Sequence, residues 1–559
     1  AYRNDVVRFY PQATANASAS FESDGTLLSP ARWPNDGFAH IESVIDEGTI
    51  LSSAQSADEL RGATFKIPTE KAELWKNAKD AWLMGLWKYD WAEQNTPVAS
   101  VDAENAIITA EYAFSSGVSA YGGLQGGKYY IFNLPEELDA PGEYYVDRSE
   151  NVFYLYPPQN AQTINVSAMT EPLVKLSACK NIKIENIKFA DSRDMGIYAD
   201  SCEKIEIGNC TFSNISQEGI NLDNCKNSTV RSCKLYNLGG CGVRLSNTYT
   251  GSLVSENNVV ADCVIHDYAT RNMMYSPGIY VNGTGAKITH NEIFNAPHNA
   301  IVFVGNSNTI EYNNIHNVVN NTNDAGAIYS GKSWIQRGNV IKNNYFHDLK
   351  GSDTCGAVHA VYLDDFFCGT LIKSNIFENI TGGSSSAIAG CGRDTVISDN
   401  IFIDCLNMIR VNGFSGFDKN YDSILKDWTD TQARGILSNV FQNNIALYKE
   451  LYGDSICDYK EVSENSPREN LKYNLTHKGS VMKNNVLYRT DKFFYSFTDP
   501  RFAKIDTSSH ASDEEPAATL ADLLWTYGVP ILIKDKNGIG FTDEAAKDYT
   551  LNANSTVYK

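Results

Sequence analysis

The stretch Cys179–Cys225, CKNIKIENIKFADSRDMGIYADSCEKIEIGNCTFSNISQEGINLDNC, repeats itself at a fixed interval. Cys179, Cys202 and Cys225 are each separated by 23 residues, and Cys210 lies 23 residues before Cys233. A fixed period in the range of roughly 20–50 residues is typical of chains built from stacked structural repeats. The two cysteine columns therefore predict a solenoid.

Asparagines and short apolar runs recur with the cysteines. An Asn or Asp comes just before a short run in ENIKF, GNCTF, HNEIF, YNNIH and SNIFE, and a second run follows in GIYAD, GINLD, GIYVN, AIYSG and AVYLD. Units with two or three short β-rich runs and turn residues between them do not fit helical pairs. They predict an all-β, right-handed parallel β-helix over residues 171–413.

The repeated residue types suit the interior of such coils. Asparagine tolerates the left-handed backbone conformation of tight turns and can hydrogen-bond coils above and below, which satisfies buried polar groups. Cysteine is small and polarisable, so it fills narrow interior positions. Twelve cysteines without a CxxC pair favour buried free thiols over a disulfide framework or a zinc site, and no metal or other cofactor is predicted.

The length and charge of the chain narrow the functional classes. At 559 residues it exceeds one compact core, so an elongated solenoid or several modules are expected. The formal net charge of −20 counts against nucleic acid and anionic membranes as partners. No apolar stretch is long enough to cross a bilayer as a helix, so no membrane insertion is expected. The oligomeric state stays open.

The residues flanking the repeats lack its period. Residues 1–170 are expected to form a β-rich N-terminal domain with a helix around Pro68–Lys79 and a hairpin at Gly142–Pro158, where GEYYVDRSENVFYLYPP carries a turn between two aromatic runs. Residues 414–479 are expected to form a mixed or helical insertion, and residues 480–559 a last coil and a C-terminal cap. An aromatic run of the N-terminal domain contains Trp82, Trp87 and Trp91. These side chains are expected in the domain core, and a carbohydrate-stacking platform is the alternative.

Strand alternation assigns directions to the side chains of the second apolar run. The inward residues are Ile197, Ile220, Val243, Ile279, Ile301, Ile328, Val361, Ile388 and Ile409. The first outward stripe is Tyr198, Asn221, Arg244, Tyr280, Val302, Tyr329, Tyr362, Ala389 and Arg410. The second outward stripe is Asp200, Asp223, Ser246, Asn282, Val304, Gly331, Asp364, Cys391 and Asn412. Aromatic, arginine and carboxylate side chains on one face are typical of a carbohydrate groove.

Carboxylates interrupt this pattern in the middle of the solenoid. Glycoside hydrolysis uses two carboxyl groups that flank the scissile bond. The candidates are Asp364 in YLDD and Asp324, one coil earlier in NDAGAIYSG, which can meet only if the turns between them curl together. The residues expected to bind substrate around this pair are Tyr329, Tyr362, Trp334, His298, His359, Asp365 and Arg410. Trp334 lies in an inserted loop, where an indole can stack on a sugar or pack against the coil.

Three stretches together resemble the right-handed β-helix glycoside hydrolases, a group that includes β-xylosidases, fucosidases and lacto-N-biosidases. They are YLDDFFCGTLIKSNIFEN, NDAGAIYSG and GEYYVDRSENVFYLYPP, and the similarity covers most of residues 140–415. In the β-xylosidase branch the aspartate that ends a strand is the nucleophile, which corresponds to Asp364 here. The acid of that branch is a glutamate, and the matching position is Ala389, so Asp324 is the substitute acid.

The resemblance implies a secreted or cell-surface exo-acting glycosidase that acts on a neutral oligo- or polysaccharide. Two other classes remain open. A polysaccharide lyase or epimerase would use Lys332 or Arg410 as base and a Ca²⁺ ion bound near Asp364 and Asp365. A non-catalytic glycan-binding or structural β-helix would use Asp364 only to end a strand, since a fold does not imply a function.

Overall fold

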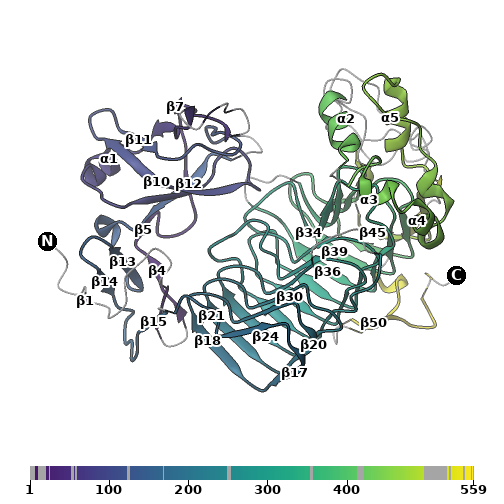
Figure 1. Cartoon of the computed structure of the whole chain (residues 1–559), viewed down its shortest axis with the longest axis horizontal. Helices are drawn as coiled ribbons and strands as arrows, with labels where there is room; N and C mark the ends of the chain where they lie inside the picture. Colours follow the sequence, from purple (N-terminus) through teal and green to yellow (C-terminus); the bar gives the residue numbers. More distant parts are fainter. Residues whose placement is uncertain are drawn as a thin grey trace.

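The structure is a computed structural model of the chain. It describes residues 7–9, 20–23, 26–51, 54, 56, 59–122, 126–167, 169–247, 253–352, 357–411, 421–431, 434–490, 492–495, 526–527, 530–534, 536–544, 548–555 and 557. Three long parallel sheets form a solenoid, an antiparallel N-terminal domain stands beside its first coils, and a group of helices stands beside its later coils (Figure 1). The predicted parallel β-helix is confirmed.

Each coil of the solenoid contributes one strand to each of three 11-stranded sheets. Sheet one contains β16 (Val174–Ser177), β19 (Ile197–Asp200), β22 (Ile220–Asp223), β25 (Val243–Ser246), β28 (Ile279–Asn282), β31 (Ile301–Val304), β34 (Ala325–Gly331), β37 (Val358–Asp364), β40 (Ser386–Gly390), β43 (Asn407–Val411) and β46 (Lys492–Tyr495). Sheet two contains β17 (Lys180–Glu185), β20 (Glu203–Gly208), β23 (Thr229–Arg231), β26 (Val259–Ala261), β29 (Lys287–Thr289), β32 (Thr309–Glu311), β35 (Asn339–Lys342), β38 (Thr370–Lys373), β41 (Val396–Ser398), β44 (Val481–Lys483) and β47 (Thr526–Tyr527). Sheet three contains β18 (Lys188–Ser192), β21 (Thr211–Ile215), β24 (Lys234–Leu238), β27 (Val264–His266), β30 (Glu292–Phe294), β33 (Asn314–His316), β36 (Tyr345–Leu349), β39 (Ile376–Ile380), β42 (Ile401–Ile403), β45 (Val486–Tyr488) and β48 (Ile531–Ile533).

The N-terminal domain is antiparallel apart from one strand pair and contains one α-helix among its described residues, α1 (Thr69–Trp75), within the predicted helical segment. Its largest sheet is made of β5 (Arg32–Trp33), β6 (Ala39–His40), β7 (Val44–Asp46), β8 (Thr64–Lys66), β9 (Trp82–Leu86), β10 (Glu93–Asp102), β11 (Ile107–Ala110) and β12 (Lys128–Phe132). A second sheet contains β1 (Val7–Phe9), β4 (Ser29–Pro30), β13 (Glu143–Asp147) and β14 (Val152–Tyr156), and a third contains β2 (Ser20–Ser23), β3 (Thr26–Leu27) and β15 (Asn165–Ser167). Strands β13 and β14 pair antiparallel, which confirms the predicted hairpin.

The described helices of the insertion lie between β43 and β44. They are α2 (Tyr421–Thr429), α3 (Asn439–Gln442), α4 (Ile445–Tyr452), η4 (Asp454–Cys457) and α5 (Arg468–Leu475). Beyond them β44, β45 and β46 complete one coil and β47 and β48 begin a further one, so the solenoid continues past the single coil that the sequence predicts there. The described part of the cap contains the short helix η6 (Lys536–Gly538) and a hairpin of β49 (Phe541–Asp543) and β50 (Asp548–Leu551). No described helix meets the length and hydropathy needed to cross a membrane.

A ladder of buried asparagines joins successive coils at one corner. The members are Asn291, Asn313, Asn344, Asn375, Asn400 and Asn485. In each neighbouring pair, the backbone N–H and the side-chain amide of one asparagine both donate to the side-chain oxygen of the next, at 2.9–3.1 Å. Each ladder residue follows a residue with positive φ, so the ladder stands one position after the left-handed turn residue rather than on it. The ladder thus satisfies buried polar groups that the corner would otherwise strand.

One of the two cysteine columns, which contains Cys210 and Cys233, takes the same place in the earlier coils. The Cys233 N–H donates to the Cys263 sulfur, and the Cys263 N–H donates to the Asn291 side chain, so the thiols and the asparagines form one continuous column. The described cysteines are all free, and most are buried, as predicted.

Strand register confirms the side-chain directions predicted for sheet one. All nine predicted inward residues are fully buried. The first outward stripe stands in one line of cross-strand partners from Tyr198 to Arg410. The second stripe holds from Asp200 to Val304 and again where Gly331 pairs with Asp364. Cys391 departs from that stripe because it is fully buried with a φ of 75°, and Asn412 lies outside the described residues.

We expect Asn344→Leu to lower the free energy of unfolding by at least about 2 kcal/mol, because the Asn313 N–H and side-chain amide lose their buried acceptor. Chemical denaturation followed by circular dichroism measures this change. Asn443→Ala, at an exposed helix end, is the matched control and should change stability little. Equal stability of the two variants would contradict a structural role for the ladder.

Candidate active site

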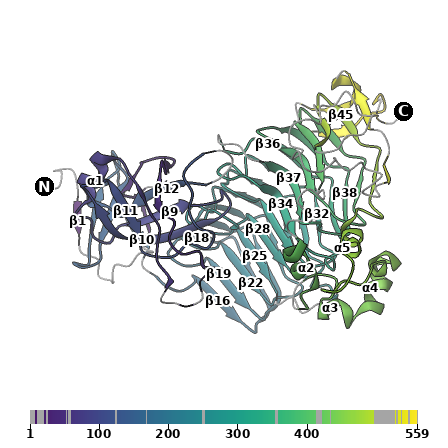
Figure 2. The ribbon, with the colours of Figure 1, turned by 90° about the horizontal axis from the view of Figure 1, so that it is seen from above.

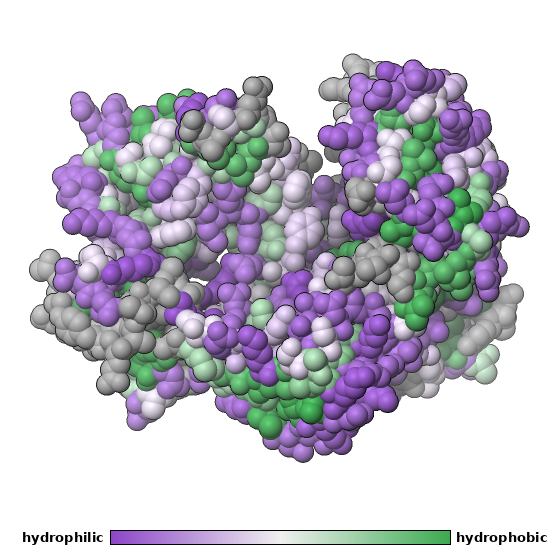
Figure 3. All heavy atoms as spheres, in the orientation of Figure 1, coloured by the Kyte–Doolittle hydropathy of each residue, from purple (hydrophilic) through white to green (hydrophobic). Residues whose placement is uncertain are grey.

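The candidate site lies on the outward face of sheet one, where β34 and β37 pair. Tyr329 and Tyr362 are cross-strand partners there, with ring centroids 5.6 Å apart. Asp364 is the last residue of β37 and is half-buried, and Asp365 follows it in the turn. The surface is hollowed between the N-terminal domain and the helices (Figure 3), and both α2 and β34 border this region in the ribbon views (Figure 1, Figure 2).

Asp324 reaches Tyr362 because β34 approaches β37 unusually closely at its start. Asp324 immediately precedes β34, has a φ of 50° and is exposed. Two residues later Gly326 lies so close to β37 that an added Cβ would stand 2.5 Å from the Tyr362 Cβ. Since real Cβ atoms do not approach so closely, only glycine permits this path. Asp324 thereby comes within hydrogen-bonding distance of the Tyr362 hydroxyl on the next coil.

Two tyrosine hydroxyls connect the two carboxylates. The Tyr362 hydroxyl donates to Asp324 Oδ1 at 3.0 Å, and the Tyr329 hydroxyl donates to Asp364 Oδ2 at 3.2 Å. The Tyr362 hydroxyl also lowers the pKa of Asp364 by hydrogen bonding. The negative charge of Asp324 also raises the pKa of Asp364, so the two carboxyl groups lie close enough to interact.

The surroundings of Asp364 favour its protonated form. Burial raises the pKa of Asp364 to about 6, with further upward contributions from the negative charges of Asp365 and Asp324. Burial and the charge of Asp364 raise the pKa of both Tyr329 and Tyr362, with a further contribution from Asp365 at Tyr329 and from Asp324 at Tyr362, so both phenols stay protonated and act as donors. The pair thus combines a half-buried carboxyl group of raised pKa with an exposed acidic side chain.

The helical insertion contributes to the rim of the site. Lys332 Nζ lies 2.5 Å from Asp427 Oδ2 of α2 and 3.6 Å from Asp365 Oδ2. The cation therefore bridges a carboxylate of the insertion and a carboxylate of the β37 turn. This bridge fixes α2 beside the candidate pair.

The N-terminal domain touches the coil directly before Asp324. Buried Asp90 forms an ion pair with Lys128 at 3.0 Å, and its Oδ2 accepts a hydrogen bond from the Asn323 side chain at 2.9 Å. The Thr322 hydroxyl donates to the Asp90 backbone oxygen at 2.9 Å. These contacts hold the segment that carries Asp324 against the N-terminal domain.

The aromatic run of the N-terminal domain lies only partly in the domain core. Trp87 is buried there, as predicted, whereas Trp82 is half-buried. Trp91 is only half-buried and stacks on Tyr89 at 4.8 Å, on either side of Asp90. Trp91 follows Asp90, which contacts Asn323, and its role as a sugar-stacking residue stays a prediction.

The prediction that Trp334 binds substrate is wrong. Its side chain is fully buried, and its indole N–H donates to the Ile456 backbone oxygen at 3.1 Å. Trp428 of α2 packs against it edge to face at 6.5 Å, and the Arg337 guanidinium lies 5.1 Å from the ring centroid. The inserted loop is covered by the helices, so Trp334 anchors the insertion instead of facing the hollow.

The two histidines are also not on the surface. His298 and His359 are fully buried, and burial lowers the pKa of each to about 3, so both are neutral. His298 lies behind Tyr275 at 4.7 Å, and His359 lies behind Tyr362 at 4.9 Å. The prediction that these histidines contact substrate is therefore wrong. They instead pack against the tyrosines that border the site.

Arg410 stands two coils beyond Tyr362 on the first outward stripe, with Ala389 between them. Its charge lowers the pKa of His359 and acts on Tyr362, so it lies close enough to influence the site. It remains half-exposed. The methyl side chain of Ala389 leaves room for the longer arginine side chain above it.

Three residues of the site were not predicted. Tyr275 packs edge to face on Tyr329 at 5.9 Å, and burial together with the charges of Asp364 and Asp324 raises the pKa of Tyr275 to about 12. Asp427 and Asp90 come from segments far away in the chain. No repeat or motif marks these residues, because an insertion and a separate domain bring them to the site.

Within the described ranges, no group of three or more His, Cys, Asp or Glu residues is arranged to hold a metal ion. The cation beside Asp365 is instead the Lys332 ammonium. The hypothesis of a Ca²⁺ site at Asp364 and Asp365 gains no support from this geometry.

Comparisons with known proteins agree with the fold. Residues 155–273 match the model of the right-handed β-helix region. No curated protein sequence gives a significant match. A solved structure described as "Glycoside hydrolase" is 14% identical, covers 72% of this chain and 82% of that chain, and has a TM-score of 0.52.

Two further structures are less similar. XylC in complex with xylose is 9% identical, with 90% of this chain and 74% of that chain covered and a TM-score of 0.37. A DFA-IIIase from Arthrobacter chlorophenolicus A6 in complex with DFA-III is 10% identical, with 60% and 67% covered and a TM-score of 0.30. Of these structures, only the one with a TM-score of 0.52 supports an argument, and at 14% identity it shows the fold alone.

We expect Trp334→Ala to destabilise the protein by about 3–5 kcal/mol, because a fully buried ring and its hydrogen bond are removed. Thermal unfolding together with limited proteolysis between residues 421 and 475 measures the effect. Trp91→Ala is the matched control, which should leave the unfolding midpoint nearly unchanged. A Trp334→Ala protein with native stability and weakened saccharide binding would restore the stacking role.

Proposed function

We propose that this protein is a glycoside hydrolase in which Asp324 and Asp364 form the catalytic carboxyl pair. The observation that carries the proposal is that carboxyl groups from adjacent coils each accept a hydrogen bond from one of two packed tyrosines, Tyr362 and Tyr329, on one open face. Paired carboxyl groups are the working parts of most glycoside hydrolases. The fold shared with a glycoside hydrolase is compatible with this assignment.

The difference between the two carboxyl groups suggests their roles. Asp364 has the raised pKa of a general acid, which must hold a proton at the working pH and transfer it to the leaving oxygen. Asp324 is exposed, so it has access to water and to the sugar. We therefore assign Asp364 as the acid and Asp324 as the nucleophile or base, which is the reverse of the roles implied by the resemblance.

The surroundings support a saccharide as substrate. Tyr329 and Tyr275 present aromatic surface near the pair, and Arg410 supplies a cation that can donate hydrogen bonds. The N-terminal domain and α2 border the face on two sides, which favours the end of a neutral oligo- or polysaccharide over the middle of a long chain. The protein is accordingly proposed to be exo-acting and secreted or held at the cell surface.

The lyase alternative is less well supported. Lys332, one of its candidate bases, already pairs with Asp427 and Asp365, and these carboxylates raise the pKa of Lys332 although burial lowers it. A lysine held in its charged form is a poor base.

Substituting each carboxyl group separates the two roles. We expect Asp364→Asn to lower kcat/KM on a natural oligosaccharide by about 10²–10⁴-fold but to retain most activity on an aryl glycoside with an acidic phenol as leaving group, since that phenol needs no protonation. Asp324→Asn should lose activity on both substrates. Steady-state kinetics over a panel of glycosides measures kcat/KM of both variants on each kind of substrate.

Asp422→Asn, at an exposed position of α2, is the control for the same chemical change and should retain full activity. Circular dichroism verifies that each variant is folded. Unchanged activity of Asp364→Asn on the natural oligosaccharide would remove the assignment.

The pH profile provides an independent test. The rate should fall as the pH rises through about 6, because Asp364 then loses the proton that it donates. In Asp365→Asn one neighbouring negative charge is gone, so the pKa of Asp364 falls and the alkaline limb of kcat/KM moves to lower pH. An unmoved limb, or one displaced to higher pH, would contradict this role of Asp365.

A further inference from the structure

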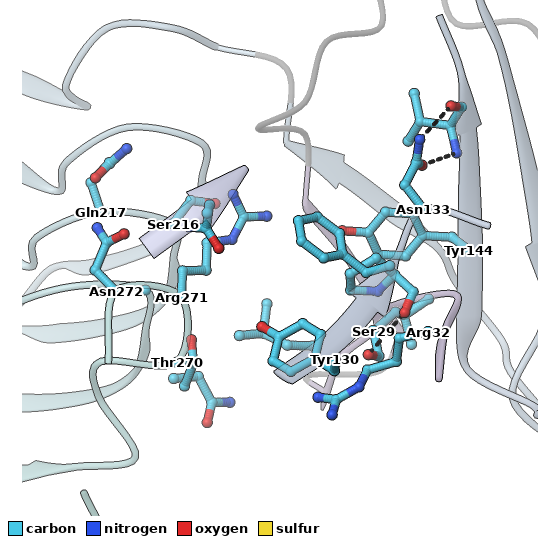
Figure 4. A pocket seen from close by; sticks show the side chains of 18 of the residues that line it. Ser29, Arg32, Tyr130, Asn133, Tyr144, Ser216, Gln217, Thr270, Arg271 and Asn272 are labelled. Carbon is cyan, nitrogen blue, oxygen red and sulfur yellow. Dashed lines mark hydrogen bonds between the residues drawn. The ribbon is translucent and has the colours of Figure 1, made fainter. Parts of the chain in front are cut away.

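A second cavity lies between the N-terminal domain and the solenoid. It has a volume of about 810 Å³, which is within the range of small-molecule sites. Side chains of both parts face each other across it (Figure 4). Arg32, Tyr130 and Tyr144 line it from the N-terminal domain, and Ser216, Arg271 and Asn272 line it from the solenoid.

The lining combines aromatic surface, neutral hydrogen-bonding groups and positive charge. The Arg32 guanidinium stacks over the Tyr130 ring at 3.7 Å, and burial lowers the pKa of Arg32. The Arg271 guanidinium hydrogen-bonds the buried Tyr144 hydroxyl, and its side chain points across the cavity in Figure 4. Aromatic rings beside hydroxyl and amide groups suit a sugar ring.

The charge of this cavity is opposite to that of the protein. The lining contains three arginines and one aspartate, although the chain carries a formal net charge of −20. One of these arginines, Arg148, pairs with Asp80 outside the lining, which leaves Arg32 and Arg271 as the main positive groups. That aspartate, Asp267, lies 2.6 Å from the His266 ring. Arg193 stands near Arg271, since burial and the Arg271 charge both lower the pKa of Arg193. The negative charge of Asp194 also acts on Arg193, so among these groups it is Arg271, which lines the cavity, that offers its charge to an anion there.

A single loop connects this cavity with the candidate catalytic pair. Thr270, Arg271 and Asn272 line the cavity, and Tyr275 of the same loop packs on Tyr329. Because consecutive Cα atoms are about 3.8 Å apart, Asn272 and Tyr275 are separated by no more than about 11 Å. Glu93 fixes the loop to the N-terminal domain by accepting hydrogen bonds from the Met273 and Met274 N–H groups at 2.8 and 3.3 Å.

We propose that this cavity binds an acidic sugar unit, with its carboxylate on Arg271, and that this unit belongs to the same glycan whose neutral linkage is cleaved at Asp324 and Asp364. Only the statement that the acidic unit belongs to the cleaved glycan rests on the proposed hydrolase function. A guanidinium fork matches a carboxylate with two parallel hydrogen bonds, and the tyrosines stack on the ring. The strongly negative protein disfavours a polyuronate, so the substrate is a mostly neutral glycan with isolated acidic units.

Binding to the inactive Asp364→Asn protein tests the cavity separately from catalysis. The probes are D-glucuronate, D-galacturonate and a xylotriose that carries one glucuronate, each compared with its carboxyl-reduced counterpart by calorimetry and ligand-observed NMR. We expect at least one acidic probe to bind about tenfold more tightly than its reduced form, as a charge-assisted hydrogen-bond pair implies. A sulfated analogue distinguishes a general anion site from a carboxylate site.

Substitution of Arg271 locates the binding. Arg271→Gln should remove the preference for the acidic probe, and Arg271→Lys should restore only part of it, because the charge remains without the fork. Arg489→Gln, an exposed arginine paired with Asp404, is the control for loss of one positive charge and should bind normally. Equal affinity for acidic and reduced probes, or a preference that survives Arg271→Gln, would overturn the proposal.

The outcomes also separate this proposal from the proposed function. If acidic probes bind through Arg271 and the Asp364→Asn enzyme keeps full activity, the proposal for the cavity is supported and the catalytic assignment is overturned. Loss of hydrolysis in Asp364→Asn without any preference for acidic probes would support the catalytic assignment and overturn the proposal for the cavity.

Discussion

The hydrogen-bonded column of asparagines and cysteines at one corner of the coils is the interaction on which the rest of the structure depends. Each asparagine oxygen receives the backbone N–H and the amide of the preceding member, so every coil is fixed relative to the next. In a low-dielectric interior these bonds are costly to leave unmade. Fixed coils in turn place equivalent residues of sheet one above one another, and this alignment produces an outward face with a defined order of side chains.

The candidate site arises where that order is locally changed. Gly326 allows β34 to approach β37 so closely that Asp324 reaches the hydroxyl of Tyr362. Asp364 ends the neighbouring strand, where burial and two like charges keep its pKa high. The regular repeat therefore places the two tyrosines side by side. The close approach of β34 to β37 brings an exposed carboxyl group, Asp324, near a half-buried one, Asp364. Precise placement of such groups on rigid elements is what acid–base chemistry requires.

Both flanking parts are attached through buried groups close to this site. The insertion packs over Trp334 and reaches the rim through Asp427, whereas the N-terminal domain is held by Asp90 beside Asp324 and by Glu93 beneath the loop that carries Tyr275. The same N-terminal contact creates the arginine-lined cavity on the other side of that loop. The solenoid alone would present a flat face, and the two attached parts give it walls.

The sequence by itself determined the repeat, the coil interior and the directions of the side chains on sheet one, because a period of 23 residues and strand alternation are local properties of the chain. It also drew attention to Asp324, Asp364, Tyr329 and Tyr362. It could not reveal that Trp334, His298 and His359 are buried, since helices and coils distant in sequence cover them. Only the tertiary structure decided the approach at Gly326, the pKa of Asp364 and the presence of Tyr275, Asp427 and Asp90, because burial and charge depend on neighbours that no local pattern specifies.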